Sequence, residues 1–330
     1  MRIARRSRLT TLTAALLFFA APVIAHSLAS STEIEAPGPL GPLKGALAGP
    51  ADAGSPAVLI IPGSGPTDRD GDNPLGVKAA TYALLAAALA ARGVTSVRID
   101  KRGMFGSAAA VADANDVTIE DYAQDVGAWA ETIRSRTGAS CVWLLGHSEG
   151  GLVAMAAAAR RPAHVCGLAL VATAGRRLGD VLKEQLRANP ANAPLLAAAD
   201  AAIDALAAGR RVDAARLHPA LAPLFRPAVQ RFLVSAFALD PADLIARVDR
   251  PVLILQGGRD IQVGLADAAR LKGACPSAML TILPDVNHVL KRVTSDDRGA
   301  NLATYADPNL PLAPGVVEAI AAFVGAPPRP

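Results

Sequence analysis

Short apolar runs alternate with longer helical stretches along most of the chain. The runs bounded by glycine or proline are AVLII (57–61), VTSVRI (94–99), CVWLL (141–145), LALVA (168–172), PVLILQ (251–256) and AMLTIL (278–283). Strands that alternate with helices predict a mostly parallel central sheet with helices on both faces. Ahead of these runs, STEIEA and PLKGAL predict a short antiparallel start.

Between the predicted strands, apolar residues recur with a helical period. Residues 118–138 place Ile119, Tyr122, Val126, Trp129 and Ile133 on one face. Thr118 is expected to cap this helix and Gly138 to end it. A second helix is predicted over residues 80–93, with Leu84, Leu85 and Leu89 on its core face.

One connection is far longer than the others. About eighty residues separate Ala172 from Pro251, whereas a crossover between parallel strands needs little more than a dozen. The excess is rich in alanine, leucine and proline and predicts several short helices. They are inserted after the sixth predicted strand, LALVA, when STEIEA and PLKGAL are counted as the first two. Because the insertion leaves the carboxyl edge of the sheet, we expect residues 174–247 to form a lid. The core would then comprise residues 26–173 and 248–330.

The first residues have the layout of a secretory signal peptide, with a basic stretch, about a dozen apolar residues and then small residues. Cleavage is predicted after Ala25, so that residues 1–25 are removed, with Ala29 as an alternative. The apolar stretch is shorter than the roughly 20 residues that a spanning helix needs, which predicts no stable membrane insertion after cleavage. A periplasmic or secreted protein is expected. The Arg5-Arg6 pair leaves both the general and the twin-arginine export routes open.

Export changes the interpretation of the charge. The formal net charge is +4, and the predicted signal peptide contains four arginines and no acid. Its removal brings the net charge to zero, so the composition gives no indication of nucleic-acid binding.

The cysteines are Cys141, Cys166 and Cys275. Cys141 and Cys166 begin neighbouring predicted strands, so a disulfide between them and three buried free thiols are both compatible with the sequence.

The strand CVWLL is followed by GHSEGG, residues 146–151, and then by a helical stretch. Glycine, any residue, serine, any residue, glycine between a strand and a helix is the pattern of a nucleophile elbow. Ser148 would occupy a sharp, strained turn, and Gly146 and Gly150 would leave room where a Cβ would collide with backbone. The helix behind Ser148 would direct its free amides toward negative charge on a substrate.

A nucleophilic serine needs a base, and in chains with such an elbow the order is serine, acid, histidine. The histidines are His26, His147, His164, His218 and His288. His147 adjoins Ser148 and is expected to point away from it, and three others fall at the processing site, before a strand or in the lid. Only His288 follows a late strand, in LPDVNHVLK, and is therefore predicted to be the general base.

The acid that orients this histidine should follow the strand PVLILQ. There the chain reads GGRDIQV, which places Asp260 at the carboxyl edge of the sheet. Asp285 lies close to His288 in the chain, and Asp267 lies on the next predicted helix. Asp260 is preferred because a loop at a strand end can present a carboxylate to the imidazole, although a helix cap is its alternative role.

The segment PGSGPTDRDGDN, residues 62–73, has three candidate functions. The calcium loop of a helix-loop-helix site has glycine at its sixth position and glutamate at its twelfth. Counting from Asp68, this chain has Asn73 and Ala79 at those positions, so the calcium interpretation fails. A phosphate loop needs a lysine and a serine or threonine that do not follow here. An oxyanion hole fits better, with the amide of Ser64 opposite that of Glu149 and with Gly65 allowing close approach. The aspartates would brace the loop through bonds to its amides.

From Leu43 onward, the chain resembles the α/β-hydrolase superfamily, and within it a group of bacterial carboxylesterases and serine hydrolases. The motifs that carry the resemblance are PGSGPTDRDG, DKRGMFGS (100–107), GHSEGG, QGGRD and NHVLK, in this order. The resemblance implies ester hydrolysis through an acyl-enzyme, with no cofactor or metal. Met104-Phe105 departs from the small residue expected near Gly106. Arg102 is expected to bond loop carbonyls rather than to act in catalysis.

These observations predict an exported serine hydrolase that cleaves small-molecule esters with small or apolar acyl groups, by way of Ser148, Asp260 and His288. A serine aminopeptidase is the alternative, because the lid carries Asp180, Glu184 and Asp200, which could hold a substrate amine. A non-catalytic envelope binding protein would be expected to have a broken triad. The natural ester and the oligomeric state stay open.

Overall fold

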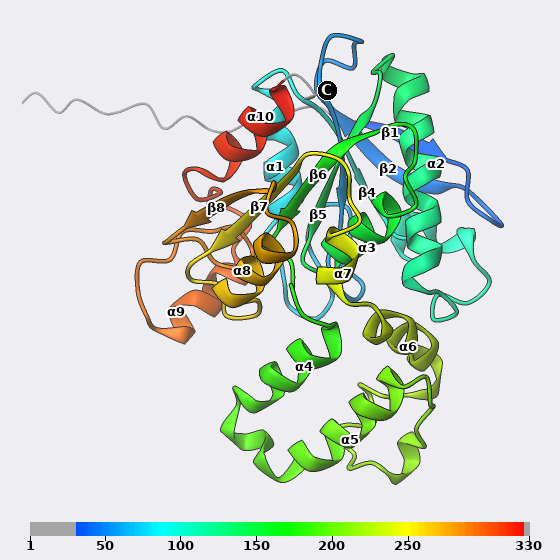
Figure 1. Ribbon diagram of the computed structural model, residues 1–330, viewed down its shortest axis with the longest axis vertical. Helices are drawn as coiled ribbons and strands as arrows, with labels where there is room; N and C mark the ends of the chain where they lie inside the picture. Colours follow the sequence, from blue (N-terminus) through cyan, green and yellow to red (C-terminus); the bar gives the residue numbers. More distant parts are fainter. Residues whose placement is uncertain (1–30, 327–330) are drawn as a thin grey trace, which may run out of the picture.

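The computed structural model describes residues 31–326, so the predicted signal peptide lies outside the described residues. Within them, a mostly parallel eight-stranded sheet runs in the order β1-β2-β4-β3-β5-β6-β7-β8 (Figure 1). The strands are β1 (Thr32–Ala36), β2 (Leu43–Ala48), β3 (Ala57–Ile61), β4 (Thr95–Ile99), β5 (Val142–His147), β6 (Val165–Val171), β7 (Val252–Gly257) and β8 (Met279–Leu283). Only the pairs β1–β2 and β2–β4 are antiparallel, as expected from the two runs at the start.

Every predicted strand is present. The strand AVLII coincides with β3, and the other predicted strands differ from the observed ones by a few residues at their ends. The largest difference is at β6, which begins at Val165, three residues earlier than expected. The strands β3, β5, β6 and β7 are buried on both faces, which explains why they read as continuous apolar runs, whereas the edge strand β8 is largely exposed.

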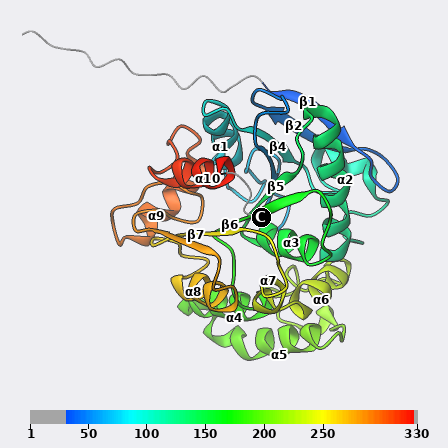
Figure 2. The ribbon, with the colours of Figure 1, turned by 45° about the horizontal axis from the view of Figure 1, so that its top comes forward.

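The helices of the core cover both faces of the sheet (Figure 2). They are α1 (Thr81–Ala90), α2 (Ile119–Thr137), α3 (Glu149–Ala158), α8 (Leu265–Ala274), α9 (Arg298–Ala303) and α10 (Val316–Gly325), with the short 3-10 helices η1 (Phe105–Ala110) and η5 (Thr304–Ala306). Alternate side chains of β3 show the division. Leu59 and Ile61 pack with α2 and α3, whereas Val58 and Ile60 pack with α1 and α10.

The helix α2 begins and ends where its sequence predicts. The Thr118 hydroxyl accepts from the amide of Asp121, and the Asp121 carboxylate accepts from the amide of Thr118, which completes a capping box. Gly138 ends the helix with φ of 76°, a left-handed conformation that glycine adopts at no steric cost. In α1, Leu85 and Leu89 are buried as expected, but Leu84 is only half-buried.

A helical insertion, residues 174–247, connects β6 to β7. Its elements are α4 (Leu178–Arg187), η2 (Pro190–Leu195), α5 (Leu196–Ala207), η3 (Ala214–Arg216), η4 (Pro227–Val229), α6 (Gln230–Ala238) and α7 (Pro241–Ile245). Figure 1 shows α4, α5 and α6 projecting beyond one end of the sheet. Ile203, Phe225 and Phe237 are buried within the insertion. The insertion thus has the short helices that its sequence predicts, and its role as a lid stays a prediction.

The sequence left open whether Cys141 and Cys166 form a disulfide or all three cysteines are free thiols, and the structure contains the disulfide. Cys141 and Cys166 form a disulfide, whereas Cys275 is a buried free thiol. The disulfide joins the starts of the neighbouring strands β5 and β6. None of the helices in residues 31–326 combines the length and the apolar character needed to cross a membrane.

Candidate active site

Ser148 occupies the tight turn between β5 and α3. Its backbone angles, φ of 55° and ψ of −121°, are unusual for a residue with a side chain and are typical of strain held at functional sites. A Cβ on Gly150 would overlap the carbonyl oxygen of Ile61, and a Cβ on Gly146 would overlap the carbonyl oxygen of Gly150. The steric reason predicted for both glycines is therefore confirmed.

The loop after β8 brings His288 to the loop after β7. The Nδ1 atom of His288 lies 2.8 Å from Oδ2 of Asp260, and the two side chains are 6% and 0% exposed. Such a bond fixes the tautomer of the imidazole and leaves its Nε2 atom available as a base.

The carboxylate of Asp260 is held by several donors. Its Oδ1 atom accepts from the amides of Gln262 at 2.8 Å and Val263 at 2.9 Å. Burial alone would raise the pKa of Asp260, but the His288 imidazole and these two amides outweigh burial and lower it. Asp260 is therefore an ionised partner for His288. The amide bonds also show that the alternative role of Asp260, as a local cap, coexists with its bond to the histidine.

The two other candidate acids lie elsewhere. The Asp267 carboxylate accepts from the amide of Gly175 at 3.0 Å and pairs with the Arg176 guanidinium at 2.8 Å, which anchors the start of the insertion. Asp285 is half-exposed, and its carboxylate lies 3.8 Å from the Arg292 guanidinium. Of the three candidates, Asp260 is the one that contacts His288.

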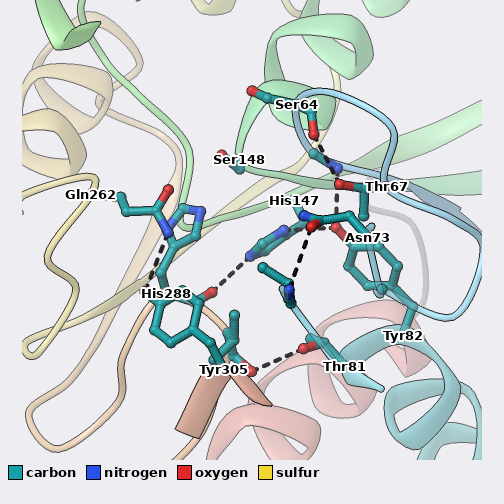
Figure 3. A pocket seen from close by; sticks show the side chains of 14 residues that line it. Ser64, Thr67, Asn73, Thr81, Tyr82, His147, Ser148, Gln262, His288 and Tyr305 are labelled. Atoms are coloured by element: carbon teal, nitrogen blue, oxygen red, sulfur yellow. Dashed lines mark hydrogen bonds between the residues drawn. The ribbon is translucent and has the colours of Figure 1, made fainter. Parts of the chain in front are cut away.

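A cavity of about 130 Å³ lies beside Ser148 and His288 (Figure 3). The polar side chains that line it with them are Ser64, Thr67, Asn73, Thr81, Tyr82, His147, Gln262 and Tyr305. Within residues 31–326, the Ser148 hydroxyl makes no hydrogen bond to His288. Catalytic hydrogen bonds are often long before a substrate binds. What relates Ser148 to His288 here is that both side chains line the same cavity.

The loop after β3 approaches the elbow closely. A Cβ on Gly63 would lie 3.3 Å from the Ser148 Cβ atom, so only a residue without a side chain fits there comfortably. The next residue, Ser64, lines the cavity, whereas Gly65 turns the chain away with φ of 67°. Within residues 31–326, the amides of Ser64 and Glu149 donate no hydrogen bond to another backbone group. Both amides are therefore available to a ligand.

Comparison with known proteins identifies the family of the chain. Residues 75–291 match the family described as serine aminopeptidase, S33. The chain belongs to this family of α/β-hydrolases. The chain is also similar to esterase EstD of Thermotoga maritima, with 26% identity over 243 residues, which are 71% of this chain and 54% of that protein. The chain thus spans about half the length of this relative.

Solved structures with low sequence identity share the fold of this family. Est1E from Butyrivibrio proteoclasticus is 17% identical with a TM-score of 0.53, covering 89% of this chain and 99% of that one. Proline iminopeptidase from Mycobacterium smegmatis is 15% identical with a TM-score of 0.55, covering 89% and 97%. At these identities the similarity concerns the α/β-hydrolase fold alone.

His147 differs from its prediction. It was expected to point away from Ser148, but its ring lines the same cavity, between Tyr82 and His288 (Figure 3). Its Nε2 atom lies 2.8 Å from the carbonyl oxygen of His288, and its Nδ1 atom lies 2.8 Å from the Tyr82 hydroxyl oxygen. The expectation failed because β5 extends through His147, so that this side chain follows the strand rather than the turn.

The protonation of His147 follows from these partners. A carbonyl oxygen can only accept, so Nε2 carries the proton and Nδ1 accepts from the Tyr82 hydroxyl. Burial, and then the nearby His288, lower the pKa of His147 to about 3. His147 is therefore a neutral residue that connects Tyr82 with His288.

The loop that follows Gly65 is braced largely as predicted. The Asp68 carboxylate accepts from the amides of Asp70 and Asp72, and the Asp72 carboxylate accepts from the amide of Ala80. Asp70 departs from the prediction, because its carboxylate pairs with the Arg98 guanidinium at 2.7 Å. The side chain of Asp70 points toward β4, where a stronger partner than an amide is available.

Arg102 also differs from its prediction. Its guanidinium does not serve loop carbonyls but pairs with the carboxylates of Asp125 at 2.6 Å and Asp121 at 3.3 Å, both on α2. The sequence could not indicate this pairing, because it depends on α2 packing beside the loop after β4. The motif residue Arg102 therefore connects that loop to the core helix and lies outside the cavity beside Ser148.

Proposed function

We propose that the protein is a serine hydrolase that cleaves carboxylic esters with short acyl groups. The observation that carries this proposal is the His288–Asp260 pair at 2.8 Å, in the cavity that Ser148 also lines. Membership of the α/β-hydrolase family and the similarity to esterase EstD support it.

The mechanism follows from the positions of these groups. His288 accepts the proton of the Ser148 hydroxyl as the serine attacks the ester carbonyl, and Asp260 stabilises the imidazolium that forms. The amides of Ser64 and Glu149 bind the oxyanion, and such a donor is typically worth about 3 kcal/mol of transition-state stabilisation. His288 then gives its proton to the leaving alcohol. A water molecule repeats the sequence and releases the acid.

The size and lining of the cavity favour a short acyl group. A dry cavity of about 150 Å³ is enough for a molecule the size of benzene, and the cavity here is about 130 Å³. Polar side chains, among them Asn73, Gln262 and Tyr305, contribute much of its lining. We therefore favour the small acyl groups of the sequence-based prediction over long apolar chains.

Ser148→Ala is the direct test of the proposal. It should abolish hydrolysis of p-nitrophenyl acetate and labelling by a fluorophosphonate, whereas Ser135→Ala, on the exposed face of α2, should leave both unchanged. Wild-type activity should fall steadily from acetate to decanoate. Labelling or turnover that persists in Ser148→Ala would refute the proposal. Ligand binding without turnover across a broad ester panel would support a non-catalytic protein instead.

Aminopeptidase activity is the second candidate, because the family is described as serine aminopeptidase. A substrate amine needs a carboxylate near the reacting bond, and no acidic side chain lines the cavity within residues 31–326. Two of the lid acids suggested for this role, Glu184 and Asp200, already pair with arginines. Esters are therefore the preferred substrates. Assays of aminoacyl nitroanilides beside p-nitrophenyl esters distinguish the two activities.

Export is also part of the proposal. The Cys141–Cys166 disulfide supports it, because disulfides persist mainly in oxidising compartments. The predicted signal peptide is its sequence basis. The mass and N-terminal sequence of the mature protein, together with fractionation of the expressing cell, test export. A cytoplasmic protein that retains its first residue would contradict it.

A further inference from the structure

Two side chains from distant parts of the chain hold the two polar atoms of Gly63. The amide of Gly63 donates to the Tyr82 hydroxyl at 3.0 Å, and its carbonyl accepts from the Lys101 ammonium at 2.7 Å. Tyr82 lies on α1, and Lys101 follows β4. The side chains of both are buried, at 2% and 3% exposure. The backbone of Gly63 is therefore fixed by side chains rather than by the sheet.

Each of these side chains also contacts a neighbour of Ser148. The Tyr82 hydroxyl lies 2.8 Å from Nδ1 of His147, and the Lys101 ammonium lies 3.2 Å from Oε1 of Glu149. His147 and Glu149 stand immediately before and after Ser148 in the chain. Two bridges, Gly63–Tyr82–His147 and Gly63–Lys101–Glu149, thus join the loop after β3 to both sides of the elbow.

The donor and acceptor roles in the first bridge, and the charges in the second, follow from the chemistry of the side chains. Because the Tyr82 hydroxyl accepts from the Gly63 amide, its own proton is free for Nδ1 of His147, and the neutral tautomer of His147 then donates to the His288 carbonyl. In the second bridge, the Lys101 and Glu149 side chains are 3% and 4% exposed, so each compensates the buried charge of the other. The two bridges therefore hold the peptide units on either side of Gly63, the preceding one through its N–H and the following one through its carbonyl.

We propose that Tyr82 and Lys101 are positioning residues for the oxyanion hole. The peptide that follows Gly63 carries the Ser64 amide, so fixing Gly63 fixes one proposed oxyanion donor relative to Ser148 and to the Glu149 amide, which is the other. Preorganised donors stabilise a transition state because they need no reorientation as charge develops. The hydrogen bond from His147 to the His288 carbonyl connects the loop of the general base to the same network of contacts. This inference rests on the proposed esterase function.

Tyr82→Phe tests the first bridge, because it removes a hydroxyl and keeps the ring. Lys101→Met combined with Glu149→Gln tests the second without leaving a buried charge unpaired. For p-nitrophenyl acetate, we expect each variant to lower kcat about tenfold to a hundredfold, with KM changed by less than about threefold. The oxyanion exists only in the transition state, which is why kcat should carry the loss.

A short-chain trifluoromethyl ketone provides a readout that a purely structural role would not change. Its adduct with Ser148 carries an oxyanion, so its inhibition constant should rise by the factor by which kcat/KM falls. Thr137→Val, which removes a buried hydroxyl at the C-terminal end of α2, is the matched control and should keep wild-type kcat and inhibition.

Two outcomes would overturn the inference. One is a kcat within about twofold of wild type in both bridge variants, and the other is a loss that leaves inhibition by the ketone unchanged. Failure of the proposed function is distinguishable, because it would appear as activity retained by Ser148→Ala. If a bridge variant is less stable, kcat is compared at a temperature where circular dichroism shows it fully folded.

Discussion

The Nε2 atom of His147 lies 2.8 Å from the carbonyl oxygen of His288, so the residue before the proposed nucleophile supports the loop of the proposed base. This bond needs a neutral imidazole that is protonated on Nε2. Because burial lowers the pKa of His147 to about 3, folding should depend on pH through this residue.

The sign of this dependence follows from the lowered pKa. Between about pH 6.5 and about pH 3, the unfolded chain binds a proton at His147 that the folded chain does not, so the free energy of unfolding should fall as the pH falls. The slope is at most about 1.4 kcal/mol per pH unit. Thermal unfolding of the wild type and His147→Gln from about pH 4 to 7 measures it. The variant should show the shallower dependence, and equal slopes would contradict the neutral, buried state.

Asp260→Asn should show whether Asp260 orients His288 for catalysis or only fills space beside it. Asparagine preserves the shape but can donate a proton to His288 Nδ1, which selects the wrong tautomer and removes the stabilising charge. We expect kcat to fall about a thousandfold to ten-thousandfold. Asp285→Asn, a matched substitution close to His288 in the chain, should leave kcat within about twofold, because its half-exposed carboxylate lies 3.8 Å from Arg292. Comparable losses in the two variants would refute the assignment of the acid.

Gly150→Ala should destabilise the protein, because its Cβ would overlap the carbonyl oxygen of Ile61. Relief requires the elbow or β3 to shift, and overpacking of this kind typically costs about 1–3 kcal/mol. Gly127→Ala on α2 is the control. No atom lies within 4 Å of its added Cβ, so it should stabilise the helix by about 0.5–1 kcal/mol. Thermal melts of both variants test the opposite signs. An unchanged melting temperature for Gly150→Ala would show that the elbow tolerates the side chain.

Removal of the disulfide should weaken the fold. In the chain-entropy model, a cross-link over a sequence separation of 25 contributes about 3–4 kcal/mol. The double variant Cys141→Ser/Cys166→Ser should therefore unfold at a lower urea concentration than the wild type. Alkylation after denaturation should modify one thiol, Cys275, without reductant and three with reductant. Three modified thiols without reductant would show that the bridge does not form.

Much of the core could be predicted from local rules. The central strands appeared as apolar runs because a parallel sheet buries both of its faces, and α2 carried its own cap at Thr118 and its own stop at Gly138. Ser148 was identifiable because a nucleophile elbow needs glycines at fixed spacing. His288 followed by elimination. Each of these inferences needs only spacing along the chain.

The partners of long polar side chains could not be predicted in this way. The carboxylate of Asp70 pairs with Arg98 rather than with a loop amide, and Arg102 reaches α2 rather than loop carbonyls. Tyr82 had no signal at all, because its position on a helix face of apolar residues indicated core packing. Its hydroxyl is significant only once α1 lies beside the loop after β3.

The sequence by itself determined the α/β architecture, the elbow at Ser148 and the order of the candidate acid and base, because periodicity, glycine spacing and chain order are local properties. Only the tertiary structure decided that Tyr82, Lys101 and His147 meet around Gly63 and Ser148. These contacts join residues on different elements that are separated by 19 to 65 positions along the chain. Their existence depends on how helices and strands pack and on the direction of each side chain, which no pattern along the chain specifies.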